Sequence, residues 1–191
     1  RVGAKYLLRT DVSQFYPSIY THTIPWVLHT KAAAKLGIND MSLVGNQIDK
    51  ELQASQYGQT KGIAIGPDTS LGIAELIMSF VDQQLAKECK FLGGVRFIDD
   101  MEFSFERLSD AEAALSRLES LLYEYELQLN AAKTAIAALP VELDSLFVSI
   151  LRAEIPDSKQ PSRAQWIDYF NRAFELAKQH PTDAVLRYAI A

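Results

Sequence analysis

The chain has 191 residues, of which 48% are hydrophobic and 23% charged, so it can bury a core and is not a disordered segment. Its single cysteine, Cys89, excludes a disulfide framework and a multi-cysteine zinc site, and its net charge of −5 argues against a nucleic-acid binder with a dominant basic face. No apolar run approaches the ~20 residues of a membrane span, and no signal-peptide pattern opens the chain, which favours a reducing compartment and no membrane contact. Because the first residue is Arg1, we expect a fragment of a longer protein.

The first half of the chain predicts one strand followed by helices. The apolar run Tyr6–Val12 predicts a buried strand that contains Asp11 near its end. Pro17 fits the first turn of a helix that we expect to reach about Thr30. The later elements are helices over Lys31–Gly37, Leu43–Tyr57 and Asp68–Lys87, with a glycine-punctuated loop over Gly58–Pro67.

The second half predicts a hairpin, a helix and a strand. β-branched and aromatic residues over Val95–Phe105 flank Asp99 and Asp100, which predicts a tight hairpin with both aspartates at its turn. Ser109 and Glu112 have the spacing of a capping box at the start of a helix. That helix is expected to reach about Gln128, followed by a strand over Lys133–Leu139, an undecided segment over Pro140–Ile150 and a helix over Trp166–Lys178.

This order of elements predicts an α+β fold. A hairpin, a helix and a further strand form a split βαβ unit, and alternating helices and antiparallel strands give a sheet with helices on one face. Asp11, Asp99 and Asp100 would then meet at one end of the sheet.

Carboxylates placed between apolar strands indicate a cation site. Asp99 and Asp100 repel each other, and burial penalises both charges, but a divalent cation removes that cost. Magnesium prefers oxygen ligands, and two such ions can clamp the attacking and leaving oxygens of a phosphoryl transfer. The alternative is a solvated Asp-Asp turn with no ligand.

Four segments resemble, in order, the sequence motifs of the reverse transcriptase palm. They are Asp11–Tyr16, Gly62–Ser70, Phe97–Asp100, and Leu129-Asn130 with Lys133-Thr134. The resemblance covers roughly Lys5 to Leu151. Ala64, Ile65 and Phe97 depart from the family's frequent proline, glutamine and tyrosine, and none of the three is a metal ligand.

The resemblance implies a catalytic metal site. Asp11 and Asp99 would be the main ligands, Asp100 would support the second ion or the charge of the site, and the backbone carbonyl of Val12 would complete the shell. The cofactor implied is a pair of Mg²⁺ ions, with Mn²⁺ as the alternative. The reaction implied is the addition of deoxynucleotides to a 3′-hydroxyl.

The same resemblance implies contacts with the nucleotide and the template. Tyr16, preceded by Phe15, would lie under the incoming sugar and exclude a 2′-hydroxyl, while Gly66 and Ser70 would line the nucleotide and template pocket. Lys133 would lie near the triphosphate and donate a proton to pyrophosphate. Without the resemblance, core packing explains Tyr16 better than a sugar contact does, and Lys133 is better explained as a solvated lysine.

The resemblance also implies a domain organisation and a setting. Residues 1–151 would form the palm with part of the fingers, whose upstream part is missing, and residues 152–191 a helical extension that begins a thumb. Residues 45–76 are most similar to bacterial abortive-infection and defence-associated reverse transcriptases, which implies a cytoplasmic bacterial enzyme of anti-phage defence. The partners implied are deoxynucleoside triphosphates with an RNA or DNA template and primer, or a protein primer, and an oligomer is compatible with this setting.

Two other functions remain open at this point. One is a polymerase-like scaffold that binds a partner without chemistry of its own. The other is a cyclase-like palm that makes a cyclic nucleotide, although Tyr16 and the Gly62–Ser70 loop favour a polymerase.

Overall fold

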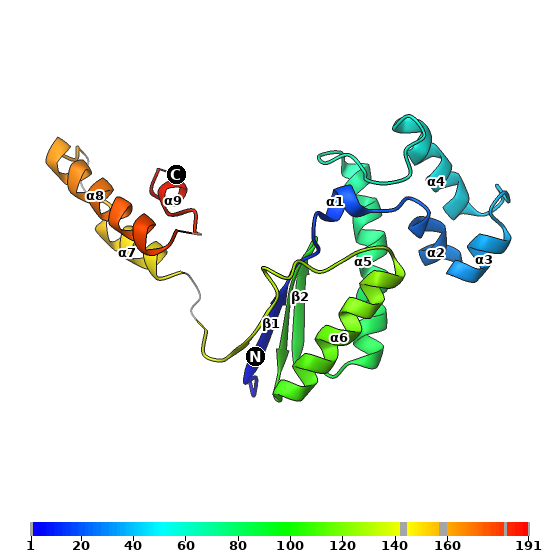
Figure 1. Ribbon diagram of the computed structural model, residues 1–191, viewed down its shortest axis with the longest axis horizontal. Helices are drawn as coiled ribbons and strands as arrows, with labels where there is room; N and C mark the ends of the chain where they lie inside the picture. The colour runs from blue at the N-terminus through cyan, green and yellow to red at the C-terminus, as the bar shows by residue number, and fades with distance from the viewer. Residues whose placement is uncertain (1, 142–144, 157–159, 182, 191) are drawn as a thin grey trace. The chain divides into compact units, whose positions relative to one another are not determined.

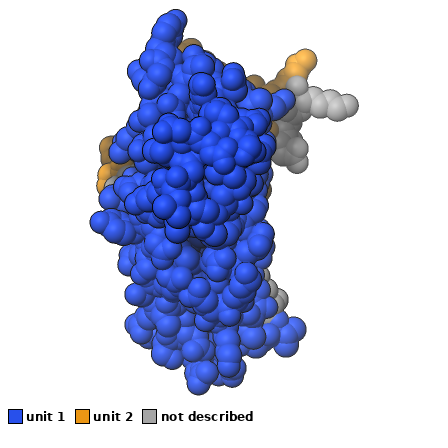
Figure 2. Space-filling view, turned by 90° about the vertical axis from the view of Figure 1, so that its right-hand side faces the viewer, with its two compact units in different colours: residues 1–139 blue, residues 140–191 orange. Residues whose placement is uncertain are grey.

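The computed structural model describes residues 2–141, 145–156, 160–181 and 183–190. The chain falls into two compact units, residues 1–139 and residues 140–191 (Figure 2). The first unit contains a four-stranded sheet and helices, whereas the described part of the second contains helices alone. No helix in the described ranges is both long and apolar enough to cross a membrane.

The sheet of the first unit is antiparallel between every pair of neighbours. Its strands are β1 (Tyr6–Thr10), β2 (Gly93–Phe97), β3 (Asp100–Phe105) and β4 (Ala135–Ala138), in the order β2-β3-β1-β4. Since β3 and β4 both run antiparallel to β1, they are parallel to each other, and the helix α6 (Leu108–Glu124) joins them across β1. The predicted α+β fold with a split βαβ unit is therefore confirmed.

The two faces of the sheet differ in what covers them. Leu8 pairs with Phe103, and both side chains enter the core with residues of α6 and of α5 (Asp68–Glu88), which lie together beside the sheet (Figure 1). The alternate pair, Arg9 and Glu102, points to the other face and forms an ion pair of 2.8 Å with both side chains exposed. One face of the sheet is thus closed by helices, and the other is available at the end near Asp11.

The helix predicted from Pro17 to Thr30 is wrong, because two short helices replace it. They are α1 (Phe15–Ser18) and α2 (Thr23–His29). Between them Tyr20 pairs with Lys61 in an isolated β-bridge, which draws the backbone out of helical geometry. Pro25 then falls in the first turn of α2, where a helix needs no N–H, whereas it would interrupt one continuous helix.

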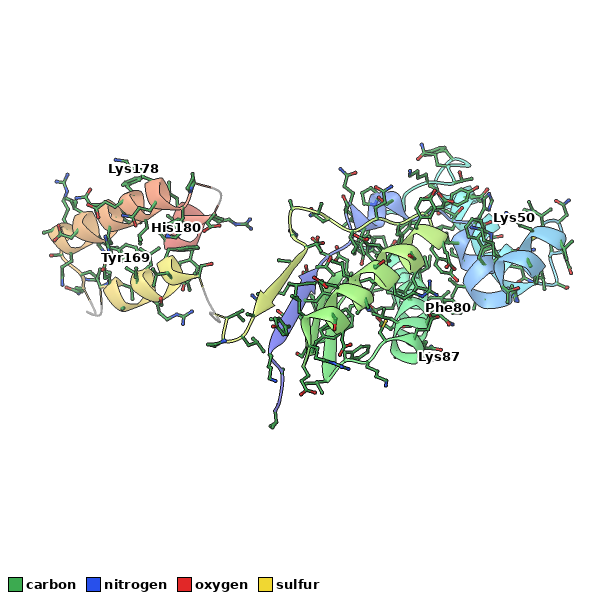
Figure 3. The ribbon with its side chains drawn as sticks, turned by 60° about the horizontal axis from the view of Figure 1, so that its bottom comes forward. Lys50, Phe80, Lys87, Tyr169, Lys178 and His180 are labelled. Carbon is green, nitrogen blue, oxygen red and sulfur yellow. The ribbon has the colours of Figure 1, made fainter. Side chains whose placement is uncertain are left out.

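The other helices of the first unit follow the predicted pattern. They are α3 (Lys31–Leu36), α4 (Val44–Ser55) and, as given above, α5 and α6. The edge contact between Phe80 and Tyr125, with ring centroids 5.7 Å apart, adds to the packing of α5 against the end of α6 (Figure 3). The predicted capping box at Ser109 does not form, because α6 begins one residue earlier and places that serine inside its first turn.

The second unit has a small core of its own. Its helices are α7 (Leu146–Glu154), α8 (Arg163–Gln179) and α9 (Val185–Ala189), and a capping box of Ser162 with Gln165 opens α8. Tyr169 is buried among these helices and donates a hydrogen bond to the carbonyl of Ala189 (Figure 3). Because α7 packs Leu151 into this core, the units divide between residues 139 and 140, ahead of the boundary expected at residue 151.

Candidate active site

Asp11 directly follows the central strand β1 and is almost entirely buried. Its Oδ2 lies 2.5 Å from the Nζ of Lys133, and its backbone carbonyl accepts a hydrogen bond from the amide of Asn130. Its Oδ1 is buried and has no hydrogen-bond partner among the described residues. A buried carboxylate oxygen without a partner costs about 1–3 kcal/mol or more, so this atom is suited to bind a cation.

The predicted hairpin forms, but the prediction that both aspartates lie at its turn is wrong for Asp100. Phe97 pairs with Asp100, so Ile98 and Asp99 alone form the turn and Asp100 is the first residue of β3. Ile98 has a φ of 58°, a left-handed conformation that is unfavourable for a β-branched residue. Partial burial raises the pKa of the Asp99 carboxyl, and the charges of Asp100 and Asp11 raise it further. The three carboxylates are therefore close enough to repel one another.

A shallow cavity of about 420 Å³ lies over the open face of the sheet at this end. It brings together three of the predicted site residues, Asp11, Asp100 and Lys133. Its other lining residues are Arg9, Thr10, Val95, Phe97, Met101 and Glu102. Phe97 is 74% exposed, so the cavity joins carboxylates to an exposed aromatic ring.

Lys133 reaches Asp11 because a tight turn precedes β4. The amide of Lys133 donates to the carbonyl of Asn130, and the hydroxyl of Thr134 donates to the same carbonyl at 2.9 Å. The hydroxyls of Thr134 and Thr10 lie 2.6 Å apart and join this turn to β1. The hydrogen bond to Asp11 raises the pKa of the Lys133 ammonium, with the charges of Asp11, Asp100 and Asp99 acting in the same direction. Lys133 is therefore a protonated group aimed at the predicted metal ligand.

The donor set fits a hard divalent cation. Asp11, Asp99 and Asp100 supply carboxylate oxygens, and Asp11 Oδ1 has no other partner in the described part of the chain. Val12 forms an isolated bridge with Leu129 whose two hydrogen bonds use the amide of Ser13 and the carbonyl of Asp11, so the bridge does not use the Val12 carbonyl. Within the described ranges no three carboxylate, imidazole or thiol side chains are close enough to hold an ion together. The donor set therefore has the chemistry of a hard-cation site, while the described carboxylates stand apart and Lys133 contacts Oδ2 of Asp11.

Of the predicted nucleotide-contact residues Lys133 lines the cavity, and the other four lie outside it. Phe15 is buried in the core and Tyr16 is half-buried beside it, with ring centroids 5.6 Å apart. Gly66 is exposed with a φ of 116°, a conformation that a residue with a Cβ rarely adopts, and Ser70 is buried in the first turn of α5. The amide of Ile63 donates to the carbonyl of Tyr16, which joins this loop to the segment after Asp11.

The most important residue that the sequence analysis missed is Arg96. It lies between Val95 and Phe97 on β2 but faces the opposite side of the sheet, where it bonds to Glu75 and Asp82 of α5. A charged residue at a helix-facing position of an apolar strand, three residues before Asp99, is the signal that would have identified it. Arg9 and Glu102 on the open face were missed as well.

Comparison with known proteins adds one result. The family model described as reverse transcriptase (RNA-dependent DNA polymerase) matches residues 1–169, which is most of the chain. No curated protein matches the sequence.

Proposed function

Because the chain belongs to the reverse transcriptase (RNA-dependent DNA polymerase) family, we propose that Asp11, Asp99 and Asp100 form its catalytic metal site. The family carries out nucleotidyl transfer with nucleotide substrates, a nucleic-acid template and divalent metal ions. For this chain the proposed reaction is the addition of a deoxynucleotide to a 3′-hydroxyl with release of pyrophosphate. The observation that carries the proposal is Oδ1 of Asp11, which is buried near the two hairpin carboxylates and has no hydrogen-bond partner among the residues that the structure describes.

The proposed cofactor is a pair of Mg²⁺ ions, with Mn²⁺ as the alternative. Two ions in such a site activate the attacking hydroxyl and neutralise the charge that develops on the leaving phosphates. Asp11 and Asp99 are the proposed shared ligands, Asp100 supports the second position, and the Val12 carbonyl completes the shell. The burial of Asp11 strengthens its attraction for a cation, because water screens that carboxylate less than the hairpin carboxylates.

Lys133 has two proposed roles. In the ion-free protein its ammonium neutralises Asp11 across 2.5 Å. Because the raised pKa keeps the ammonium protonated at neutral pH, the same group can donate a proton to the leaving pyrophosphate once it has moved off the carboxylate. Its side chain is 63% exposed, which gives it the freedom to move.

The nucleotide contacts proposed for Phe15, Tyr16, Gly66 and Ser70 follow the family motifs. The backbone hydrogen bond from Ile63 to Tyr16 supports placing these residues at one site. It holds the loop that leads to Gly66 against the segment that carries both aromatic rings. Tyr16 is the residue proposed to exclude a 2′-hydroxyl, and Phe15, which is buried, supports it from the core.

The proposed setting is bacterial defence against phage, from the likeness of residues 45–76 to defence-associated members of the family. Residues 1–139 are proposed to form the palm with part of the fingers, and the helical unit over residues 140–191 to begin the thumb.

The test is nucleotide incorporation by the full natural protein. Each labelled deoxynucleotide is supplied with Mg²⁺, with and without a primed RNA template, beside the variant Asp99→Asn. Incorporation that disappears in the variant is the expected result, and its dependence on template separates templated from untemplated synthesis. Incorporation by Asp99→Asn at the native rate, or none by the native protein, contradicts the proposal and favours a scaffold.

A further inference from the structure

Arg96 is a buried cation in the helix-facing layer of the sheet. Its neighbours Val95 and Phe97 point to the open face, so the alternation of β2 directs Arg96 toward α5, where its side chain is only 10% exposed. Burying a charge is costly unless hydrogen bonds and opposite charges compensate it. The surroundings of Arg96 provide both.

Four of the five N–H groups of Arg96 are used. Nη1 and Nη2 donate to the two carboxylate oxygens of Glu75 at 2.8 and 2.9 Å, and Nε donates to Asp82 at 2.9 Å. The remaining bond runs from Nη1 to the backbone carbonyl of Ile98 at 2.7 Å. The hydrogen bonds to Glu75 and Asp82 raise the pKa of the guanidinium, while that of the Glu75 carboxyl is lowered. The planar fork of arginine makes this arrangement possible, and the single ammonium of a lysine cannot reproduce it.

The bond to Ile98 reaches the peptide group that directly precedes Asp99. Ile98 has an unfavourable positive φ, and such conformations persist where the surroundings hold them. Once the Ile98 carbonyl is fixed, the plane of the Ile98–Asp99 peptide is fixed as well, and with it the direction in which the Asp99 side chain leaves the turn. Arg96 thus ties the turn to α5, a helix of 21 residues.

We propose that Arg96 is a positioning residue that sets the metal affinity of the site by holding the Ile98–Asp99 turn against α5. It touches neither metal nor substrate and acts through the backbone of Asp99. The inference deepens the proposed function and rests on it, because it takes Asp99 as a metal ligand. Residues that orient metal ligands typically change metal affinity 10- to 100-fold when they are replaced.

The experiment measures Mn²⁺ binding directly, by the electron paramagnetic resonance signal of free Mn²⁺, in the full protein without nucleotide. Arg96→Lys keeps the positive charge and removes the fork. The matched control is Arg117→Lys on α6, since Arg117 also forms a two-bonded ion pair with an acid of α5, Glu88, and has Glu124 rather than the hairpin as its further partner. Asp99→Asn reports whether the hairpin holds the ion at all.

We expect Arg96→Lys to weaken Mn²⁺ binding at least about 10-fold, and Arg117→Lys to leave it within about twofold. Equal affinities for these two variants, with binding lost in Asp99→Asn, would overturn the positioning role and leave the proposed function intact. Native affinity in Asp99→Asn would instead overturn the metal site itself and the inference with it. The two failures are therefore distinguishable.

Glu75→Gln covers the case in which Arg96→Lys does not fold. This variant keeps the shape of the partner but removes its charge, so Arg96 is held less firmly while its bond to the turn remains. We expect Mn²⁺ binding weaker than in Arg117→Lys, together with faster hydrogen exchange at the backbone amides of residues 98–101. Affinity and exchange equal to those of Arg117→Lys would contradict the proposal.

Discussion

Asp11 and the Asp99–Asp100 hairpin carry the same chemical group but are held in different ways. Asp11 follows the central strand, with β3 and β4 on either side, and is 4% exposed. The hairpin joins the edge strand β2 to β3, has an unfavourable backbone conformation at Ile98, and is fixed from outside by Arg96. The sheet alone therefore positions the first carboxylate, whereas positioning the other two also depends on the helix layer.

The largest expected loss of activity comes from replacing Asp11, the carboxylate that follows the central strand. Asp11→Asn removes a charged ligand, and we expect nucleotide incorporation to fall at least about 10³-fold, because metal ions contribute several kcal/mol to transition-state stabilisation. Thermal denaturation gives a second measurement, since Mg²⁺ that binds the folded state should raise the Tm of the native protein and not that of the variant. A variant that keeps its activity, or an equal Mg²⁺-dependent rise in Tm, would place the ion elsewhere.

The next effect separates proton donation from metal binding. Lys133→Met removes the ammonium that contacts Asp11, and we expect incorporation to fall about 10²-fold, the lower end of what a general acid contributes. Binding of Mn²⁺ should not weaken, because the ammonium occupies Oδ2 of the carboxylate that is proposed to bind the ion, and two cations beside one carboxylate repel each other. Lys87→Met, an exposed position at the end of α5, serves as the control (Figure 3). Weaker Mn²⁺ binding in Lys133→Met would show that the lysine assists the ion instead.

The smallest effect concerns the hairpin and its stability against acid. The hydrogen bond from Arg96 lowers the pKa of the Glu75 carboxyl, so the pair stabilises the fold fully above the unfolded pKa of about 4.3 and loses this contribution as the pH falls through the lower folded value. The difference in unfolding free energy between the native protein and Glu75→Gln should be at most about 1 kcal/mol at pH 7, since the Glu75 side chain is 43% exposed. Urea unfolding at pH 7 and at pH 3.5 measures this difference. A difference that stays constant or grows toward pH 3.5 would contradict the assignment.

Local patterns predicted most elements of the first unit. The apolar run around Leu8 and the β-branched and aromatic residues that flank the Asp99–Asp100 pair identified three strands. The helical spacing of the segment over α5 identified that helix almost to the residue. The same reasoning failed between Ile19 and His22, where pairing with the distant Lys61 overrides the local preference for helix. The capping box at Ser109 failed for a related reason, since the helix begins one residue before it.

The features of the candidate site also divide into those that the sequence determined and those that only the tertiary structure decided. The sequence by itself determined which residues are carboxylates, that two of them lie at or next to a hairpin turn, and that the order of motifs resembles that of a polymerase palm. Only the tertiary structure decided that Lys133 lies on Asp11, that Arg96 holds the turn, and that residues 140–151 join the second unit. The physical reason is that strand and helix periodicity act over a few neighbouring residues, whereas these contacts join segments up to 122 residues apart through packing and charge.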